Sequence, residues 1–269
     1  MTTRMTVERL GRLIAAGDAE AIRTALESST RLLSSTVERA GQGGWTPLHV
    51  AVAEGQADIV GLLVGAGADL TARTEHHRTP LHIALQFSPD LVPLLLELGA
   101  VLDAPSAAYL DDVGQLDREL GNGTRPTDRA SGADLLSWAA LGGAVRTATL
   151  LLERGADADG GALHAAATGS RLELIQLLLD AGADADRRDP DTGRAPLHVA
   201  VAAGPGGDAP EIVRVLLKAG ADVNATTSDG ASALDISRVA AARHRTNDAG
   251  QASGNDALAE LLVSHGATE

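Results

Sequence analysis

The chain has 269 residues and a formal net charge of −14, which repels phosphate backbones and anionic lipids, so we expect neither a nucleic acid nor a membrane as a partner. Aromatic residues make up only 1% of the chain, which excludes a single large core built on aromatic rings and favours thin layers of helices. The absence of cysteine excludes disulfides and thiolate metal sites and fits a reducing compartment.

The N-terminal residues 5–40 predict a capping helix pair, because their charges are spread over a face that suits solvent at the end of a stack. These charges also interrupt any apolar core of a signal peptide, and no stretch approaches the roughly 18 apolar residues of a membrane-spanning helix. The composition, rich in Ala, Gly, Arg and Asp, suggests a bacterial source. We therefore expect a cytoplasmic bacterial protein.

Two short motifs recur along the remainder of the chain. The sequence Thr-Pro-Leu-His begins at Thr46 and again at Thr79, and weaker copies begin at Ala162 and Ala195. A leucine run followed by Gly-Ala-Asp ends the repeating unit, with its glycine at Gly67, Gly155, Gly182 and Gly220.

Each part of the motif has a physical role in a helix pair. Threonine caps the inner helix, and proline at the first helical position gives up only an N–H that has no partner there. Small residues after the leucine allow close packing of the next layer, and a glycine such as Gly55 forms the turn to the outer helix. Because one pair cannot bury its own apolar face, the pattern predicts a stack.

The Thr-Pro-Leu-His motif, the glycine between the helices and the terminal Gly-Ala-Asp resemble the ankyrin-repeat family over nearly the whole chain. The resemblance implies an all-α repeat solenoid of about eight helix pairs, with β-hairpin fingers and a concave groove. It also implies that the motif histidines, His49, His82, His164 and His198, bind backbone atoms of the adjoining finger.

The recurring motifs predict five segments. They are the capping helix pair at 5–40, two consensus ankyrin repeats at 41–103, a degenerate repeat with a long finger at 104–132, three ankyrin repeats at 133–226, and a C-terminal capping repeat at 227–269. Within the last segment, we expect residues 243–256 to insert a polar loop.

The candidate binding residues are polar finger residues and the few aromatic residues of the groove face, because aromatic side chains dominate interface hot spots. His77 occupies the position of the turn glycine in other repeats, where a side chain strains the backbone unless the turn changes shape. The predicted binding residues are Trp45, Glu54, His76, His77, Arg78, Gln86, Phe87, Tyr109 and Arg194.

These residues favour a binding module over an enzyme. The chain has no nucleophile elbow, zinc-protease motif or phosphate loop, so we assign no catalytic residue, metal ligand or cofactor. The alternative is a small enzyme or metabolite-binding protein that uses His76 or His77 with Tyr109 and either Glu54 or Asp111 as acid and base. The leading expectation is a monomer that recognises a protein partner, one with basic patches in view of the acidic surface.

Overall fold

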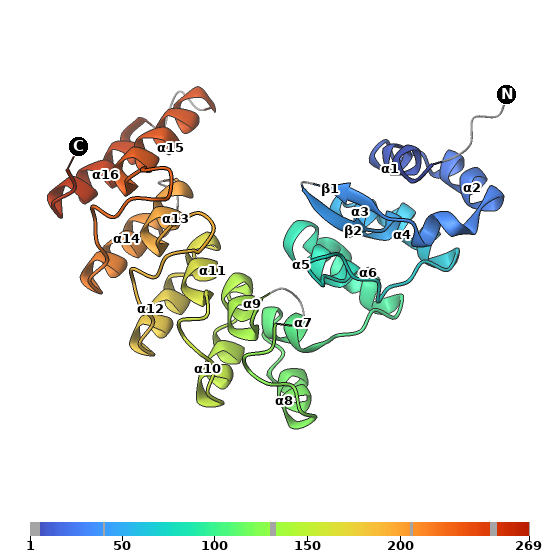
Figure 1. The fold of residues 1–269 in the computed structure, drawn as a ribbon, viewed down its shortest axis with the longest axis horizontal. Coiled ribbons are helices and arrows are strands. Elements are labelled where there is room, and N and C mark those ends of the chain that lie inside the picture. The colour runs from blue at the N-terminus through green and yellow to red at the C-terminus, as the bar shows by residue number, and fades with distance from the viewer. Residues whose placement is uncertain (1–5, 40, 130–132, 205–206, 248–251, 269) are drawn as a thin grey trace. The chain divides into compact units, whose positions relative to one another are not determined.

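The computed structural model describes residues 6–39, 41–129, 133–204, 207–247 and 252–268. The described chain forms short α-helices that follow one another in antiparallel pairs, together with one two-stranded hairpin (Figure 1). It divides into two compact units. The first contains the described residues up to Ser106 with Arg129 and Ala133, and the second contains Ala107–Asp128 and the described residues from Asp134 onward.

The first unit contains three helix pairs and the hairpin, coloured blue to green in Figure 1. Strands β1 and β2 pair antiparallel, with Val37 opposite Trp45 and Arg39 opposite Gln42. In chain order the elements are α1 (Val7–Ala15), α2 (Ala19–Ser28), the 3-10 helix η1 (Thr30–Ser34), β1 (Val37–Arg39), β2 (Gln42–Trp45), α3 (Pro47–Ala53), α4 (Ala57–Gly65), α5 (Pro80–Phe87), the 3-10 helix η2 (Pro89–Leu91) and α6 (Val92–Glu97).

The remaining helices belong to the second unit, except that α7 (Ala104–Tyr109) begins in the first unit and ends in the second. The others are α8 (Val113–Gly121), α9 (Leu135–Gly142), α10 (Val145–Glu153), α11 (Ala162–Thr168), α12 (Leu172–Asp180), α13 (Pro196–Ala202), α14 (Ala209–Lys218), α15 (Ala233–Asn247) and α16 (Ala252–Ser264).

The motif produces its helices by local capping. The Thr46 hydroxyl accepts a hydrogen bond from the backbone N–H of His49 at 3.4 Å, and Thr79 does the same for His82 at 3.3 Å. Pro47 and Pro80 occupy the first helical position, as the sequence predicts. These interactions satisfy backbone donors that an isolated helix end leaves unpaired.

Aliphatic side chains and alanines form the core. Helix α3 packs against α4 of its own pair and α5 of the next, and α11 packs in the same way against α9, α12 and α13. Alanines such as Ala51, Ala139 and Ala166 are completely buried, so neighbouring inner helices approach closely. The chain is therefore a helical repeat protein whose core is built layer by layer.

The motif histidines bind the next repeat in three cases out of four. The Nε2 atoms of His49, His164 and His198 lie 2.8–3.0 Å from the carbonyl oxygens of Arg78, Arg194 and Ala225, which confirms the expected finger contact. His82 differs from these, because its Nε2 lies 3.0 Å from the Asp103 carboxylate. The Nδ1 of His82 still accepts from the Thr79 backbone N–H at 3.1 Å, and the Asp103 carboxylate that contacts its Nε2 also caps α7 through Ser106.

The C-terminal capping repeat also departs from expectation. Helix α15 continues through Asn247, and α16 begins at Ala252, so a polar loop over 243–256 is wrong for most of that segment. Three alanines at 240–242 lead into this segment, and alanine is the strongest helix former, so the helix continues past the expected boundary. The predicted long finger lies partly outside the described residues, which exclude 130–132, and the remainder follows the end of α8.

The close approach of α7 and α9 gives a testable prediction about Gly142. A β-carbon at Gly142 would overlap the carbonyl oxygen of Tyr109, a backbone atom that cannot rotate away. We expect Gly142→Ala to lower the free energy of unfolding by about 1–3 kcal/mol in urea titrations. The matched control is Gly61→Ala in α4, where a β-carbon meets no atom within 4 Å, and which should stabilise the protein by about 0.5–1 kcal/mol. Equal effects of the two variants would contradict this packing.

Candidate binding site

The hairpin places three side chains on one side of the first unit. Arg39 and Gln42 face each other across the two strands, and Trp45 ends β2 next to the capping residue of α3. The Trp45 ring packs edge-on against His49, with ring centroids 6.1 Å apart. The Arg39 guanidinium carbon lies 5.5 Å from the centre of the Trp45 ring, a cation–π contact that fixes the arginine over the indole.

The following turn, Thr74–Arg78, is held against this hairpin. The backbone N–H of Glu75 donates to the carbonyl oxygen of Gly43 at 3.1 Å, and the Gly43 N–H donates to the Glu75 carboxylate at 2.9 Å. Gly44 has a φ of +79°, and a β-carbon there would meet Glu75 N at 2.9 Å, so glycine permits this approach. His77 adopts a φ of +58°, the left-handed conformation that its position in the turn predicts.

His49 links the inner helix α3 to this turn. Its Nδ1 accepts a hydrogen bond from the Thr46 N–H at 3.2 Å, so Nε2 carries the proton and donates to the Arg78 carbonyl oxygen at 3.0 Å. Burial lowers the pKa of His49 to about 4. The imidazole is therefore neutral at physiological pH and fixes the backbone of Arg78.

Polar contacts orient the two arginines of the site. The Arg78 guanidinium donates to the side-chain oxygen of Gln86 on α5, and burial lowers the pKa of this arginine. Arg39 Nη2 lies 2.7 Å from the Glu54 carboxylate at the end of α3. Both guanidinium groups are thus held by side chains from the ends of inner helices.

These elements surround a cavity of about 240 Å³. Phe87, the last residue of α5, lies at this cavity with 60% of its surface exposed, whereas Trp45 is 94% buried and its indole Nε1 has no hydrogen-bond acceptor among the described residues. The lining residues include no carboxylate, although the chain as a whole is strongly acidic. They are Arg39, Gln42, Trp45, Ala53, His76, Arg78, Ile83 and Phe87.

The cavity brings together most of the residues that the sequence indicated. Trp45, His76, Arg78 and Phe87 line it, while Glu54 and Gln86 orient its arginines. His77 belongs to the same turn, but its exposed side chain is not part of the lining. Arg39 and Gln42 also line the cavity but were not among the predicted residues; the signal that identifies them is their position on the strand pair that leads into Trp45.

Two further predicted residues belong to the second unit. Tyr109 is half-buried and packs edge-on against Trp138, with ring centroids 6.3 Å apart, and burial raises the pKa of its phenol. The carbonyl oxygen of Arg194 receives the hydrogen bond of His164. Asp111, a carboxylate of the alternative enzyme hypothesis, accepts a hydrogen bond from the backbone N–H of Thr147 at 2.9 Å. The acid–base group with Tyr109 or Asp111 is therefore not assembled within either unit.

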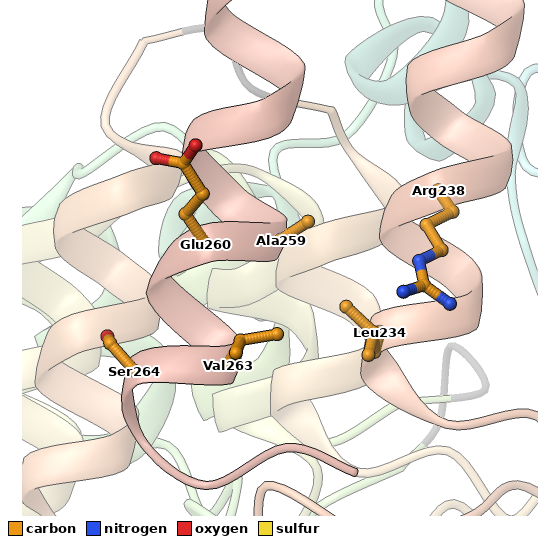
Figure 2. Close-up of a pocket in the computed structure, with 6 residues that line it drawn as sticks. All are labelled: Leu234, Arg238, Ala259, Glu260, Val263 and Ser264. Carbon is orange, nitrogen blue, oxygen red and sulfur yellow. The ribbon is translucent and has the colours of Figure 1, made fainter. Parts of the chain in front are cut away.

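Two other hollows lie in the second unit. One, of about 400 Å³, lies between α15 and α16, with Ala259 and Val263 of α16 pointing toward Leu234 and Arg238 of α15 (Figure 2). The other, of about 390 Å³, surrounds Arg171 at the helix turns. Neither has an aromatic lining residue, so the first-unit cavity is the stronger candidate for a binding hot spot.

Comparison with known proteins agrees with this architecture. A family model of ankyrin repeats, in three copies, matches residues 12–106 and 122–227, which is well over half of the chain. The chain belongs to the ankyrin-repeat family. Ankyrin repeats generally serve as protein–protein interaction modules. None of the helices in the described residues has the length and apolar character needed to cross a membrane, and these residues include no group of three or more His, Asp or Glu side chains placed to hold a metal ion.

Several curated ankyrin-repeat proteins share part of this sequence. Human protein phosphatase 1 regulatory subunit 27 is 47% identical over 62 residues, 23% of this chain and 40% of that protein. The mouse B-cell lymphoma 3 protein homolog is 36% identical over 115 residues, 42% of this chain and 21% of that protein. Human protein fem-1 homolog A is 34% identical over 94 residues, 30% of this chain and 14% of that protein. The chain thus spans less than half the length of each relative.

Proposed function

We propose that this ankyrin-repeat protein is a binding module that recognises a protein partner through the first unit, with the 240 Å³ cavity as the place where an anchoring side chain of the partner binds. The observation that carries the proposal is the convergence of Trp45, Phe87, Arg39 and Arg78 on one cavity. Aromatic and arginine side chains dominate the energy of protein interfaces.

The size of the cavity supports a side chain as its occupant. Pockets for small molecules usually enclose about 300–1,000 Å³, and this cavity lies below that range. It has room for one apolar side chain, while the remainder of a partner would contact the turn Thr74–Arg78 and the outer edge of the hairpin. The metabolite-binding alternative would have to place its ligand in the same restricted space.

The binding surface is ordered before a partner arrives, through contacts of Arg39, His49 and Arg78. The cation–π contact with Trp45 and the ion pair with Glu54 hold the Arg39 side chain, and the His49 hydrogen bond holds the Arg78 backbone. Side chains that are ordered before binding lose less conformational entropy when a partner arrives. The acidic remainder of the surface would favour the approach of a partner that carries basic patches elsewhere.

Quantitative capture of proteins from lysate of the source cells tests this proposal through Phe87→Ala. Phe87 is exposed, so its removal should leave the fold intact and weaken the captured complex about tenfold or more. Val101→Ala is the matched control, because Val101 is 64% exposed in the same unit and is not part of the cavity lining. A partner that wild type and Phe87→Ala capture equally would contradict the proposed site. A small molecule that co-purifies with wild type alone would favour the metabolite-binding alternative.

A further inference from the structure

The charge of the cavity differs from that of the chain. The sequence contains 36 acidic and 22 basic residues, yet the lining offers two guanidinium groups and His76 and includes no Asp or Glu. Two carboxylates contact the site from outside the lining, and each has a partner there: Glu54 pairs with Arg39, and Glu75 accepts from the Gly43 N–H. A ligand group in this cavity therefore meets cationic and aromatic side chains.

We infer that the cavity selects an acidic peptide segment, in which an apolar side chain packs between Trp45 and Phe87 and a neighbouring carboxylate binds the guanidinium groups of Arg39 and Arg78. This inference rests on the proposed binding function and specifies the chemistry of the partner at that site. The basic patches considered above concern the wider surface, whereas the segment inside the cavity is acidic.

The geometry of the arginines supports a carboxylate. A guanidinium has five N–H donors in a planar fork that suits a carboxylate, and the described ion pair of Arg39 joins a single nitrogen to a single oxygen of Glu54. The side chain of Arg39 is 38% exposed, so a ligand has access to it. The Arg78 guanidinium donates to the side-chain oxygen of Gln86, a neutral amide.

Charge complementarity also favours an acidic segment over a basic segment as the occupant of the cavity. A lysine- or arginine-rich segment would place like charges beside Arg39 and Arg78, which opposes binding. An acidic segment has the opposite charge at the cavity and finds aromatic and aliphatic walls in Trp45, Ile83 and Phe87 for its apolar residue. The cavity volume suits one such side chain.

Selection from a phage library of random twelve-residue peptides tests the inference with the full chain as target. The expected enriched peptides are net acidic and share an apolar residue within two positions of Asp or Glu. Synthetic copies should bind Arg78→Gln and Arg39→Gln at least about tenfold more weakly than wild type. The matched control is Arg23→Gln, because Arg23 forms an exposed ion pair with Glu20 on α2 and its loss changes the net charge equally. Circular dichroism establishes that each variant is folded, and two arginine positions keep the test valid if Arg78→Gln unfolds.

Three results would overturn the inference. Enrichment of basic or neutral peptides that still require Phe87 would leave the proposed function intact and refute the acidic partner. The absence of any enriched peptide that depends on Arg39 or Arg78 would refute the site chemistry. Sedimentation that shows a dimer of the protein alone, lost in Phe87→Ala, would make a second copy the occupant. The proposed function itself fails if the partner captured from lysate is insensitive to Phe87→Ala.

Discussion

Replacement of Trp138 by alanine should destabilise the second unit by about 3–5 kcal/mol, the usual cost of removing a large buried aromatic side chain. Trp138 is 1% exposed on α9, and its ring packs edge-on against Tyr109. This chain has only two tryptophans, one tyrosine and one phenylalanine, so its layers have few large side chains to fill the space left by the substitution. Urea unfolding followed by circular dichroism measures the loss, because the tryptophan signal changes with the variant.

Phe87→Ala provides the control for this prediction. Phe87 is 60% exposed, so its removal should change the free energy of unfolding by less than about 0.5 kcal/mol. A Trp138→Ala variant that loses less than about 1 kcal/mol would show that this ring is not a core residue of the second unit. The comparison also separates the two roles of aromatic residues in the chain, packing for Trp138 and binding for Phe87.

Acidification should destabilise the first unit through His49. An unfolded histidine has a pKa near 6.5, whereas burial lowers the pKa of His49 to about 4 in the folded state. The unfolded chain thus binds more protons between these values, so the contribution of His49 is fully present above pH 6.5 and is lost as the pH falls toward 4. The loss amounts to roughly 3 kcal/mol, since one pKa unit corresponds to about 1.4 kcal/mol.

NMR titration of the imidazole resonances measures this directly. The His49 signal, assigned by its absence in His49→Gln, should titrate with a midpoint near 4 in the folded protein and near 6.5 in urea. A folded midpoint near 6.5 would contradict the buried hydrogen bonds of His49. Because His49 fixes the Arg78 carbonyl, the same acidification should also loosen the turn that forms one wall of the cavity.

The sequence predicted those parts of the fold that depend on local chemistry. Thr46 and Thr79 cap the two helices that begin with the full Thr-Pro-Leu-His motif, because capping needs only residues a few positions apart. The left-handed turn at His77 was predictable for the same reason, since its position in the repeat fixes the backbone. The contact between His82 and the Asp103 carboxylate was not predictable from the motif, because Asp103 lies outside it.

The candidate site was predictable only in part. Trp45, His76, Arg78 and Phe87 follow from the repeat register, which places finger and helix-end residues on one face. Arg39 comes from a segment assigned to the N-terminal cap, where the sequence carries no motif to indicate a strand. Tyr109 belongs to the second unit, so its place on the same surface as Trp45 stays a prediction.

Net charge describes the whole chain and does not determine the charge of one cavity. The value of −14 predicts an acidic surface and a basic partner, but it averages over the whole molecule. The fold gathers Arg39, His76 and Arg78 from a strand and a turn that lie far apart in the sequence. The local charge of a cavity depends on this folding, and composition carries no information about it.

Site-specific photo-crosslinking tests the central claim, that the first-unit cavity binds a protein partner, most directly. A benzoylphenylalanine at position 87 should crosslink a partner protein on irradiation, whereas the same group at the equally exposed position 101 should not. Mass spectrometry of the crosslinked segment then identifies the residues of the partner that enter the cavity. A partner captured equally from positions 87 and 101, or from position 101 alone, would contradict the account.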